Sequence, residues 1–157
     1  MKTLPVLRPL LWAATIALVL QACSSPSVEA ERQRAEGAKF LRENRDKPGV
    51  VTTASGLQYQ VLEAGSGVSP KATDRVTVNY RGYLVSGDQF DGGEGVSFPL
   101  DKVIAGWTEG LQLMKEGARY RFFIPPELAY GERGAAPVIP PNATLIFEVK
   151  LVKVEPP

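Results

Sequence analysis

The stretch "VIAGWTEGLQLMKEG", residues 103–117, sets the short helix around which the rest of the sequence is arranged. Trp107, Leu111 and Met114 recur at i, i+4 and i+7, and this spacing places them on one face of a helix. The glycine that closes the stretch is typical of a helix end. We therefore expect a helix over residues 108–115 whose apolar face crosses one side of a sheet.

Four segments around this helix alternate between apolar and polar residues, with the period of two that is typical of half-buried antiparallel strands. Turn signals such as "GSG", "SGD" and "DGGEG" lie between the strand segments. The predicted fold is therefore α+β, a curved half-open antiparallel β-sheet wrapped around one short α-helix and preceded by a short N-terminal helix. The alternating apolar residues are Leu57, Tyr59 and Val61; Val76, Val78 and Tyr80; Tyr120, Phe122 and Ile124; and Leu145, Phe147, Val149 and Leu151.

The N-terminus has the pattern of an export signal. Residues 1–22 begin with Lys2 and Arg8, continue with an apolar run, and end on a small residue before Cys23. The ending "LQAC" resembles the lipobox of bacterial lipoproteins, in which the cysteine is acylated and anchors the chain to a membrane. Ser24 follows instead of an aspartate, which by the same resemblance favours the outer membrane. An ordinary cleaved signal with a chance cysteine is the alternative.

The segment after the cysteine connects this signal to the strand region. Residues 23–28 read as a linker that starts at the lipidated cysteine. Residues 29–49 read as a charged helix, predicted from Glu29 to Lys47 and ended by the Pro-Gly pair. One interpretation is a solvated helical spacer, and the other is a helix that binds a partner or dimerises.

Composition excludes several classes of function. The chain has 157 residues and a net charge of +1, and removal of residues 1–22 leaves 16 basic and 17 acidic residues. This balance gives no electrostatic footprint for nucleic acid. The absence of histidine excludes His-dependent catalysis and His-ligated metals, and a single cysteine cannot form an internal disulfide. We expect neither a cofactor nor a metal.

Aromatic residues dominate the positions expected to point inward, and polar candidates among them are few, with Asp91 the main one. Such a pocket suits an apolar group held out of water. It also suits one reaction that needs no nucleophile: rotation about an Xaa-Pro bond, with a barrier of ~18–20 kcal/mol, passes through a twisted state with less charge separation than the planar amide. The inward aromatic residues are Tyr80, Phe90, Trp107, Tyr120, Phe122, Tyr130 and Phe147.

Three long stretches carry a family resemblance: "VTVNYRGYLVSGDQFD", "FPLDKVIAGWTEGLQLMKEGARYRFFIPPELAYG" and "VIPPNATLIFEVKLV". Together they closely resemble FKBP-type peptidyl-prolyl cis-trans isomerases, in a domain that we place at residues 50–155. "FLRENRDKPGVVTTASGLQYQVLEAGSG" resembles the entry to the domain in the bacterial macrophage infectivity potentiator branch. A longer helical region dimerises in that branch, so the shorter helix here leads us to expect a monomer or a weak dimer.

The resemblance implies a catalytic set of five residues. Tyr80 would orient Asp91 through its hydroxyl, and Asp91 would accept a hydrogen bond and polarise the site. Phe90 would form a wall beside the proline ring. The Ile104 backbone N–H and the Tyr130 hydroxyl would donate to substrate carbonyls.

The resemblance also implies a set of substrate-binding residues. Trp107 would form the floor, Phe147 the inner wall, and Val103 the rim beside the catalytic residues. Val138 and Ile139 would belong to a flap over the pocket. A further rim position, aromatic in some members of the family, is Val96 here.

Two departures from the family pattern affect this pocket. The segment "FDGGEGVSFPL" lacks an Arg or Lys between Asp91 and Asp101, so we expect the family's ion pair at the first aspartate to be missing. "LDKVI" stands where an Asn-Gly pair usually precedes Val-Ile, which would alter the rim.

The leading hypothesis is a lipid-anchored prolyl isomerase of the bacterial envelope that helps proline-containing exported polypeptides to fold. Family resemblance adds macrolide-type inhibitors as ligands. A second hypothesis is a membrane-anchored chaperone or proline-peptide-binding module with weak catalysis. A third is a structural lipoprotein whose helix over residues 29–47 binds a partner.

Overall fold

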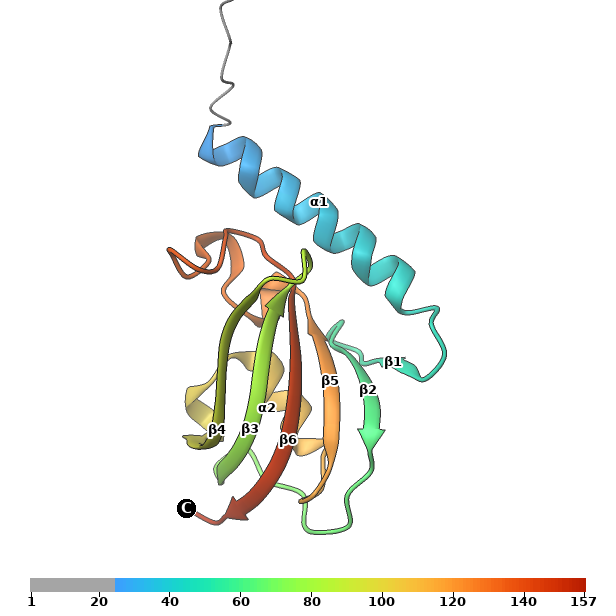
Figure 1. Cartoon of the computed structure of the whole chain (residues 1–157), viewed down its shortest axis with the longest axis vertical. Coiled ribbons are helices and arrows are strands. Elements are labelled where there is room, and N and C mark those ends of the chain that lie inside the picture. Colours follow the sequence, from blue (N-terminus) through green and yellow to red (C-terminus); the bar gives the residue numbers. More distant parts are fainter. Residues whose placement is uncertain (1–24) are drawn as a thin grey trace, which may run out of the picture.

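The computed structural model describes residues 25–157, so the predicted signal, the predicted acylation site Cys23 and Ser24 lie outside the described residues. This part of the chain contains two α-helices and six β-strands (Figure 1). None of its helices is both long enough and apolar enough to span a membrane. The elements are α1 Pro26–Asn44, β1 Val50–Thr52, β2 Gln58–Glu63, β3 Arg75–Leu84, β4 Gln89–Pro99, α2 Ala105–Gln112, β5 Arg119–Ile124 and β6 Leu145–Glu155.

The six strands form one antiparallel sheet in the order β1-β2-β5-β6-β3-β4. Phe122 of β5 pairs with Phe147 of β6, which in turn pairs with Gly82 of β3. The sheet is curved, and α2 lies across one face of it (Figure 1). The predicted α+β fold is confirmed, and the concave side that holds α2 is where a pocket can form.

Close packing holds α2 against the sheet. A Cβ atom at Gly110 would lie 2.6 Å from a ring carbon of Phe122, so only glycine allows the helix to approach this strand. Leu111 and Met114, which were predicted to share a face with Trp107, are both fully buried in the core. The helix and the inner face of the sheet therefore form one apolar layer.

The observed α2 begins three residues before the predicted helix. The carbonyl of Ile104 accepts hydrogen bonds from the amides of Trp107 and Thr108, so the first turn starts ahead of the tryptophan. The Thr108 hydroxyl donates to the Leu100 carbonyl at 2.7 Å and ties this turn to the preceding 3₁₀ turn. The apolar spacing gave the correct helix face but not its start, and Met114 lies just beyond the helix end.

The glycine-rich segment "DGGEG" was predicted to be a turn, and this prediction is wrong. It lies inside β4, where residues 91–93 pair with residues 80–82 of β3. The pairing shifts register between Val78 and Tyr80, which is where a bulge accommodates the glycines. Pairing with a long neighbouring strand here outweighs the low strand propensity of glycine.

Helix α1 is docked on the domain, which contradicts the interpretation of a solvated spacer. The rings of Phe40 and Phe123 lie 5.9 Å apart. Asn44 is buried, and its amide donates to Gln58 at 2.9 Å, while the Gln58 amide donates to the Leu41 carbonyl at 2.9 Å. The helix runs from Pro26 to Asn44, about three residues ahead of its predicted bounds, because proline is well accommodated in the first turn.

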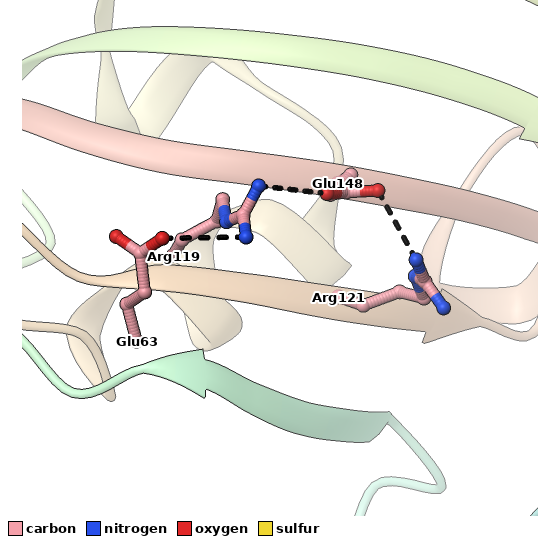
Figure 2. Close-up of polar contacts among 4 residues, drawn as sticks. All are labelled: Glu63, Arg119, Arg121 and Glu148. Atoms are coloured by element: carbon pink, nitrogen blue, oxygen red, sulfur yellow. Dashed lines mark hydrogen bonds and ion pairs between the residues drawn. The ribbon is translucent and has the colours of Figure 1, made fainter.

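The outer face of the sheet carries a chain of ion pairs (Figure 2). Glu148 of β6 accepts from Arg119 at 3.5 Å and from Arg121 at 3.2 Å, both on β5. Arg119 also pairs with Glu63 of β2 at 3.2 Å. The same strands thus present aromatic side chains on one face and paired charges on the other.

Candidate functional site

A cavity of about 390 Å³ lies between the concave face of the sheet and the start of α2. Its lining comes from β3, β4 and β6, the segment before α2, α2 itself, and the loop between β5 and β6. Seven of the residues predicted for the site meet here. The lining residues are Tyr80, Asp91, Phe98, Lys102, Val103, Ile104, Trp107, Tyr130 and Phe147.

Trp107 is the centre of an aromatic cluster in this cavity. Its ring lies 5.2 Å from Tyr80, 5.6 Å from Phe98 and 5.3 Å from Phe147, each in an edge-to-face arrangement. These distances and angles are typical of favourable aromatic contacts. Only 4% of Trp107 is exposed, so the ring is both part of the core and part of the cavity lining.

The main polar group of the cavity is a tyrosine–aspartate pair on adjacent strands. The Tyr80 hydroxyl donates to Asp91 Oδ2 at 3.0 Å, and the Gly92 amide donates to Asp91 Oδ1 at 2.8 Å. Burial raises the pKa of Tyr80 to about 12, and the hydrogen bond to Asp91 adds to the shift. Tyr80 therefore keeps its proton at neutral pH, and both oxygens of the aspartate have fixed partners.

The segment before α2 forms one rim of the cavity. Val103 and Ile104, two of the residues expected at the site, both line it. The Ile104 carbonyl is engaged by the first turn of α2, whereas its N–H donates to no partner within residues 25–157. A backbone donor at the rim of an apolar cavity can bind a ligand carbonyl.

Tyr130 approaches the cavity from the loop between β5 and β6, residues 125–144. It follows the 3₁₀ turn Pro126–Leu128 and precedes a second 3₁₀ turn, Gly131–Arg133. The residue is 42% exposed, so its side chain is accessible to a ligand. Its hydroxyl is thus a second donor at the cavity, which Ile104 also lines.

Four predicted site residues do not line the cavity. Phe90 packs against Phe147, with ring centroids 5.5 Å apart and edge to face. Val96 is half-buried on β4. Val138 and Ile139 form the tip of the β5–β6 loop, where the Ala135 and Ile139 backbones exchange two hydrogen bonds of 2.9 Å. Ile139 belongs to the core there, while Val138 is exposed.

Two lining residues escaped the prediction, namely Phe98 and Lys102. Phe98 is an aromatic residue two positions after Val96, so strand alternation places both on one face and could have favoured the larger side chain. Lys102 lies in the "LDKVI" segment whose departure from the family pattern was noted. Its ammonium pairs with Asp101 at 3.8 Å.

No salt bridge to Asp91 exists among the described residues, which agrees with the absence of a basic residue between it and Asp101. The same part of the chain contains no group of three or more side chains able to hold a metal ion. The site thus combines an aromatic cavity, two hydrogen-bond donors (the Ile104 N–H and the Tyr130 hydroxyl) and the Asp91 carboxylate, which is held by two hydrogen bonds. It suits an apolar ring flanked by carbonyls, bound without a covalent step.

Comparison with known families assigns most of the chain. Residues 67–152 match a family model described as FKBP-type peptidyl-prolyl cis-trans isomerase. Residues 14–61 match a second model, described as the domain amino-terminal to that isomerase. The first match spans all the residues that line the cavity, and the second spans α1, β1 and most of β2.

Individual relatives agree with the family match. A probable FKBP-type peptidyl-prolyl cis-trans isomerase FkpA of Neisseria meningitidis is 50% identical over 141 residues, covering 87% of this chain and 52% of the relative. Outer membrane protein MIP of Legionella longbeachae is 45% identical over 131 residues, covering 81% and 56%. The crystal structure of FkpA from Escherichia coli superposes with a TM-score of 0.80 and 47% identity, covering 83% of this chain and 63% of that one. The chain spans about half the length of these curated relatives.

Proposed function

This chain belongs to the FKBP-type peptidyl-prolyl cis-trans isomerase family, and we propose that it accelerates cis-trans rotation of Xaa-Pro bonds. The observation that carries the proposal is the aromatic cavity at the start of α2, lined by Trp107, Tyr80, Phe98 and Phe147. A proline ring fits such a cavity because it is apolar and compact. The reaction needs neither a metal nor a nucleophile.

The cavity lowers the barrier by favouring the twisted amide over the planar one. Rotation costs ~18–20 kcal/mol because the amide loses its resonance, and the twisted state has less charge separation than the planar state. An environment that excludes water therefore destabilises the planar amide relative to the twisted one. Trp107 supplies the floor, and its edge-to-face neighbours supply the walls.

Hydrogen bonds hold the substrate so that only the prolyl bond rotates. The Ile104 N–H binds one substrate carbonyl, and the Tyr130 hydroxyl binds another. Asp91, held by Tyr80 and the Gly92 amide, polarises the mouth of the cavity. Holding both ends of the substrate converts free rotation into rotation along one path, which is a gain from orientation.

The remaining residues of the site act around this centre. Phe90 supports Phe147, the inner wall, through its edge-to-face contact. Val103 contacts the substrate at the rim, and Val96 lies on β4 two residues before Phe98. Val138 and Ile139 belong to the flap, where exposed Val138 contacts the chain on either side of the proline.

A protease-coupled assay on Xaa-Pro peptides tests the proposed activity. The folded chain should accelerate isomerisation above the uncatalysed rate, and Asp91→Ala should lower kcat/KM by about 10- to 150-fold, since a hydrogen bond to a charged group contributes about 1.5–3 kcal/mol. Absence of acceleration by folded protein would remove the enzymatic proposal. Lys150→Ala, an exposed change on the outer face of β6, is the matched control.

The site of action that we propose is the bacterial cell envelope. The signal pattern of residues 1–22 supports export, and the relative named as an outer membrane protein supports this location. Acylation of Cys23 would anchor the chain, with Ser24 favouring the outer membrane and the domain facing the periplasm. Mass spectrometry of the mature protein should detect the lipid, and Cys23→Ala should release a soluble periplasmic protein. A mature chain without lipid contradicts the anchor.

Exported polypeptides that contain proline are the substrates we propose, and nucleic acid is not among the partners. Macrolide-type ligands would compete for the same aromatic cavity and should inhibit the assay above. We propose a monomer or a weak dimer. Light scattering of the soluble Cys23→Ala protein across a range of concentrations would measure the assembly.

A chaperone or proline-peptide-binding module with weak catalysis is the second candidate. The observation that favours it is the lack of a cation paired with Asp91 within residues 25–157. Such a protein would suppress aggregation of an unfolded client that contains no proline. Tyr130→Phe and Asp91→Ala would leave that suppression unchanged, so a loss of suppression in both variants would contradict this candidate.

A further inference from the structure

Asn142 lies at the end of the β5–β6 loop and is 6% exposed. It adopts the left-handed backbone region, with φ of 59°, which asparagine tolerates better than most residues. Its backbone N–H donates to the Gly131 carbonyl at 2.8 Å, and Gly131 directly follows Tyr130. The end of the loop is thus tied back to the segment that carries the tyrosine.

The side chain of Asn142 binds α1 with both of its polar atoms. Nδ2 donates to the Ala30 carbonyl at 3.2 Å, and Oδ1 accepts from the Arg34 guanidinium at 3.3 Å. In this orientation each donor faces an acceptor. A flipped side-chain amide would place its oxygen against the Ala30 carbonyl and its NH₂ against the Arg34 guanidinium. Arg34 also donates to Glu132 at 2.8 Å, one residue beyond Gly131.

A direct backbone approach reinforces this contact. Gly37 of α1 is buried against Thr144, and a Cβ atom at Gly37 would collide with the Thr144 hydroxyl. The N-terminal half of α1 and the β5–β6 loop lie side by side (Figure 1). Helix α1 is therefore seated on the same loop that brings Tyr130 to the cavity.

We propose that Asn142 is a positioning residue: it fixes the Tyr130 segment to α1, so that α1 supports the pocket. This inference rests on the proposed isomerase function. The Tyr130 hydroxyl sits on a long loop held by 3₁₀ turns, and a displacement of about 1 Å at a substrate donor is enough to lower a rate strongly. The Asn142 contacts restrict that displacement from outside the cavity.

Variants at Asn142 and Arg34 separate this role from general stability. Asn142→Gly keeps the left-handed backbone accessible but removes both bonds to α1. Arg34→Ala removes the partner on the helix. The matched control is Arg32→Ala, because Arg32 is an exposed arginine of the same helix whose ion pairs within residues 25–157 are confined to Glu29 and Glu36.

Full-length protein, assayed well below its melting temperature, should show a loss in kcat/KM of about 3- to 10-fold for Asn142→Gly and for Arg34→Ala. Arg32→Ala should match the wild type. In a Tyr130→Phe background, Asn142→Gly should cause no further loss, because the hydroxyl that it positions is gone. An unchanged kcat/KM in Asn142→Gly, or an equal loss with and without the hydroxyl, overturns the proposal.

A second readout does not depend on activity. Fluorine NMR of 3-fluorotyrosine at Tyr130 should shift or broaden in Asn142→Gly and Arg34→Ala but not in Arg32→Ala. A wild-type protein without isomerase activity would end the proposed function, and the fluorine spectra would still decide whether Asn142 positions Tyr130. Identical Tyr130 spectra in all variants would overturn the inference even if the enzyme is active.

Discussion

The two faces of the sheet differ sharply although the same strands build both. On the concave face, Phe122 and Phe147 join the aromatic layer around Trp107. On the outer face, Arg121 and Glu148, each adjacent in sequence to one of those phenylalanines, form an ion pair (Figure 2). Successive side chains of a strand point to opposite faces of the sheet, so neighbouring residues line the apolar cavity and the charged surface in turn.

The inner face of the sheet provides most of the folding stability and the proposed site, whereas the outer face contributes little to either. Burial of apolar area contributes most of the favourable free energy, whereas exposed ion pairs contribute about 0–1 kcal/mol each. The charged side chains keep the outer face solvated. They also restrict the register in which the strands pair, because a shift of one residue would move these charges into the core. The inner face holds the proposed site because it is the dry one.

The largest effect should follow from shortening an inward side chain. Phe122→Ala should lower the free energy of unfolding by about 3–5 kcal/mol, because the fully buried ring leaves a cavity under α2. Urea denaturation measures the change. Arg121→Ala, one residue away on the outer face, should cost at most about 1 kcal/mol. Similar losses in both variants would contradict the separation of the two faces.

A smaller effect should distinguish a docked α1 from a solvated one. Alanine is favoured over glycine inside a free helix by about 1 kcal/mol, so Gly37→Ala would stabilise a solvated spacer. Against Thr144 the added methyl group overpacks the contact at a cost of about 1–3 kcal/mol, and we expect a net loss of about 1 kcal/mol. Thermal and urea unfolding measure the sign.

The double variant Gly37→Ala with Thr144→Ala supplies the control for this contact. Removing the threonine hydroxyl makes room for the new methyl group, so part of the loss should be recovered as a coupling between the two sites. A stabilised Gly37→Ala single variant would show that α1 is not held against the loop in solution.

Breaking the ionic chain of the outer face should have a still smaller effect. Glu148→Gln removes the charge shared by Arg119 and Arg121, and the free energy of unfolding should fall by about 0.5–1 kcal/mol at low salt. The loss should shrink in high salt because screening weakens the wild-type pairs. Isomerase activity should stay at the wild-type level, and a large drop in activity would contradict the assignment of the site to the inner face.

The last effect appears only at alkaline pH. The pKa of Tyr80 is about 12 in the folded protein and about 10 when unfolded, so the folded state binds the proton more tightly. Its stabilising contribution is complete below about pH 10 and is lost as the pH rises through 12. Tyr80→Phe should therefore show a weaker fall in stability over this interval, as measured by urea denaturation at several pH values. Equal slopes would contradict the raised pKa.

Much of this architecture could be predicted because alternation and helical spacing report burial directly. The segments around Leu57, Val76, Phe122 and Phe147 became strands, and Trp107 lies on the buried face of α2. Of the eleven residues that the family resemblance implies for the site, seven line the cavity in the structure. These strands, the buried helix face and the lining residues follow from alternation, helical spacing and motifs within single segments.

The rest depends on contacts between distant segments. The glycines of β4 form a strand because β3 pairs with them. Helix α1 docks on Phe123, Gln58, Asn142 and Thr144, which lie on other segments of the chain. The weak apolar stripe of α1 does not predict these contacts. Phe98 shares a strand face with Val96, and the pairing of β4 with β3 places that face at the cavity.

NMR exchange spectroscopy of a short Xaa-Pro peptide with the unlipidated full domain tests the central claim most directly, because it reports catalysis and the place of binding together. We expect cis-trans exchange faster than in free peptide, with chemical-shift changes concentrated at Trp107, Ile104 and Tyr130. We expect no changes at Arg121 or Glu148 on the outer face. Unaccelerated exchange, or shifts gathered on the outer face, would contradict the account.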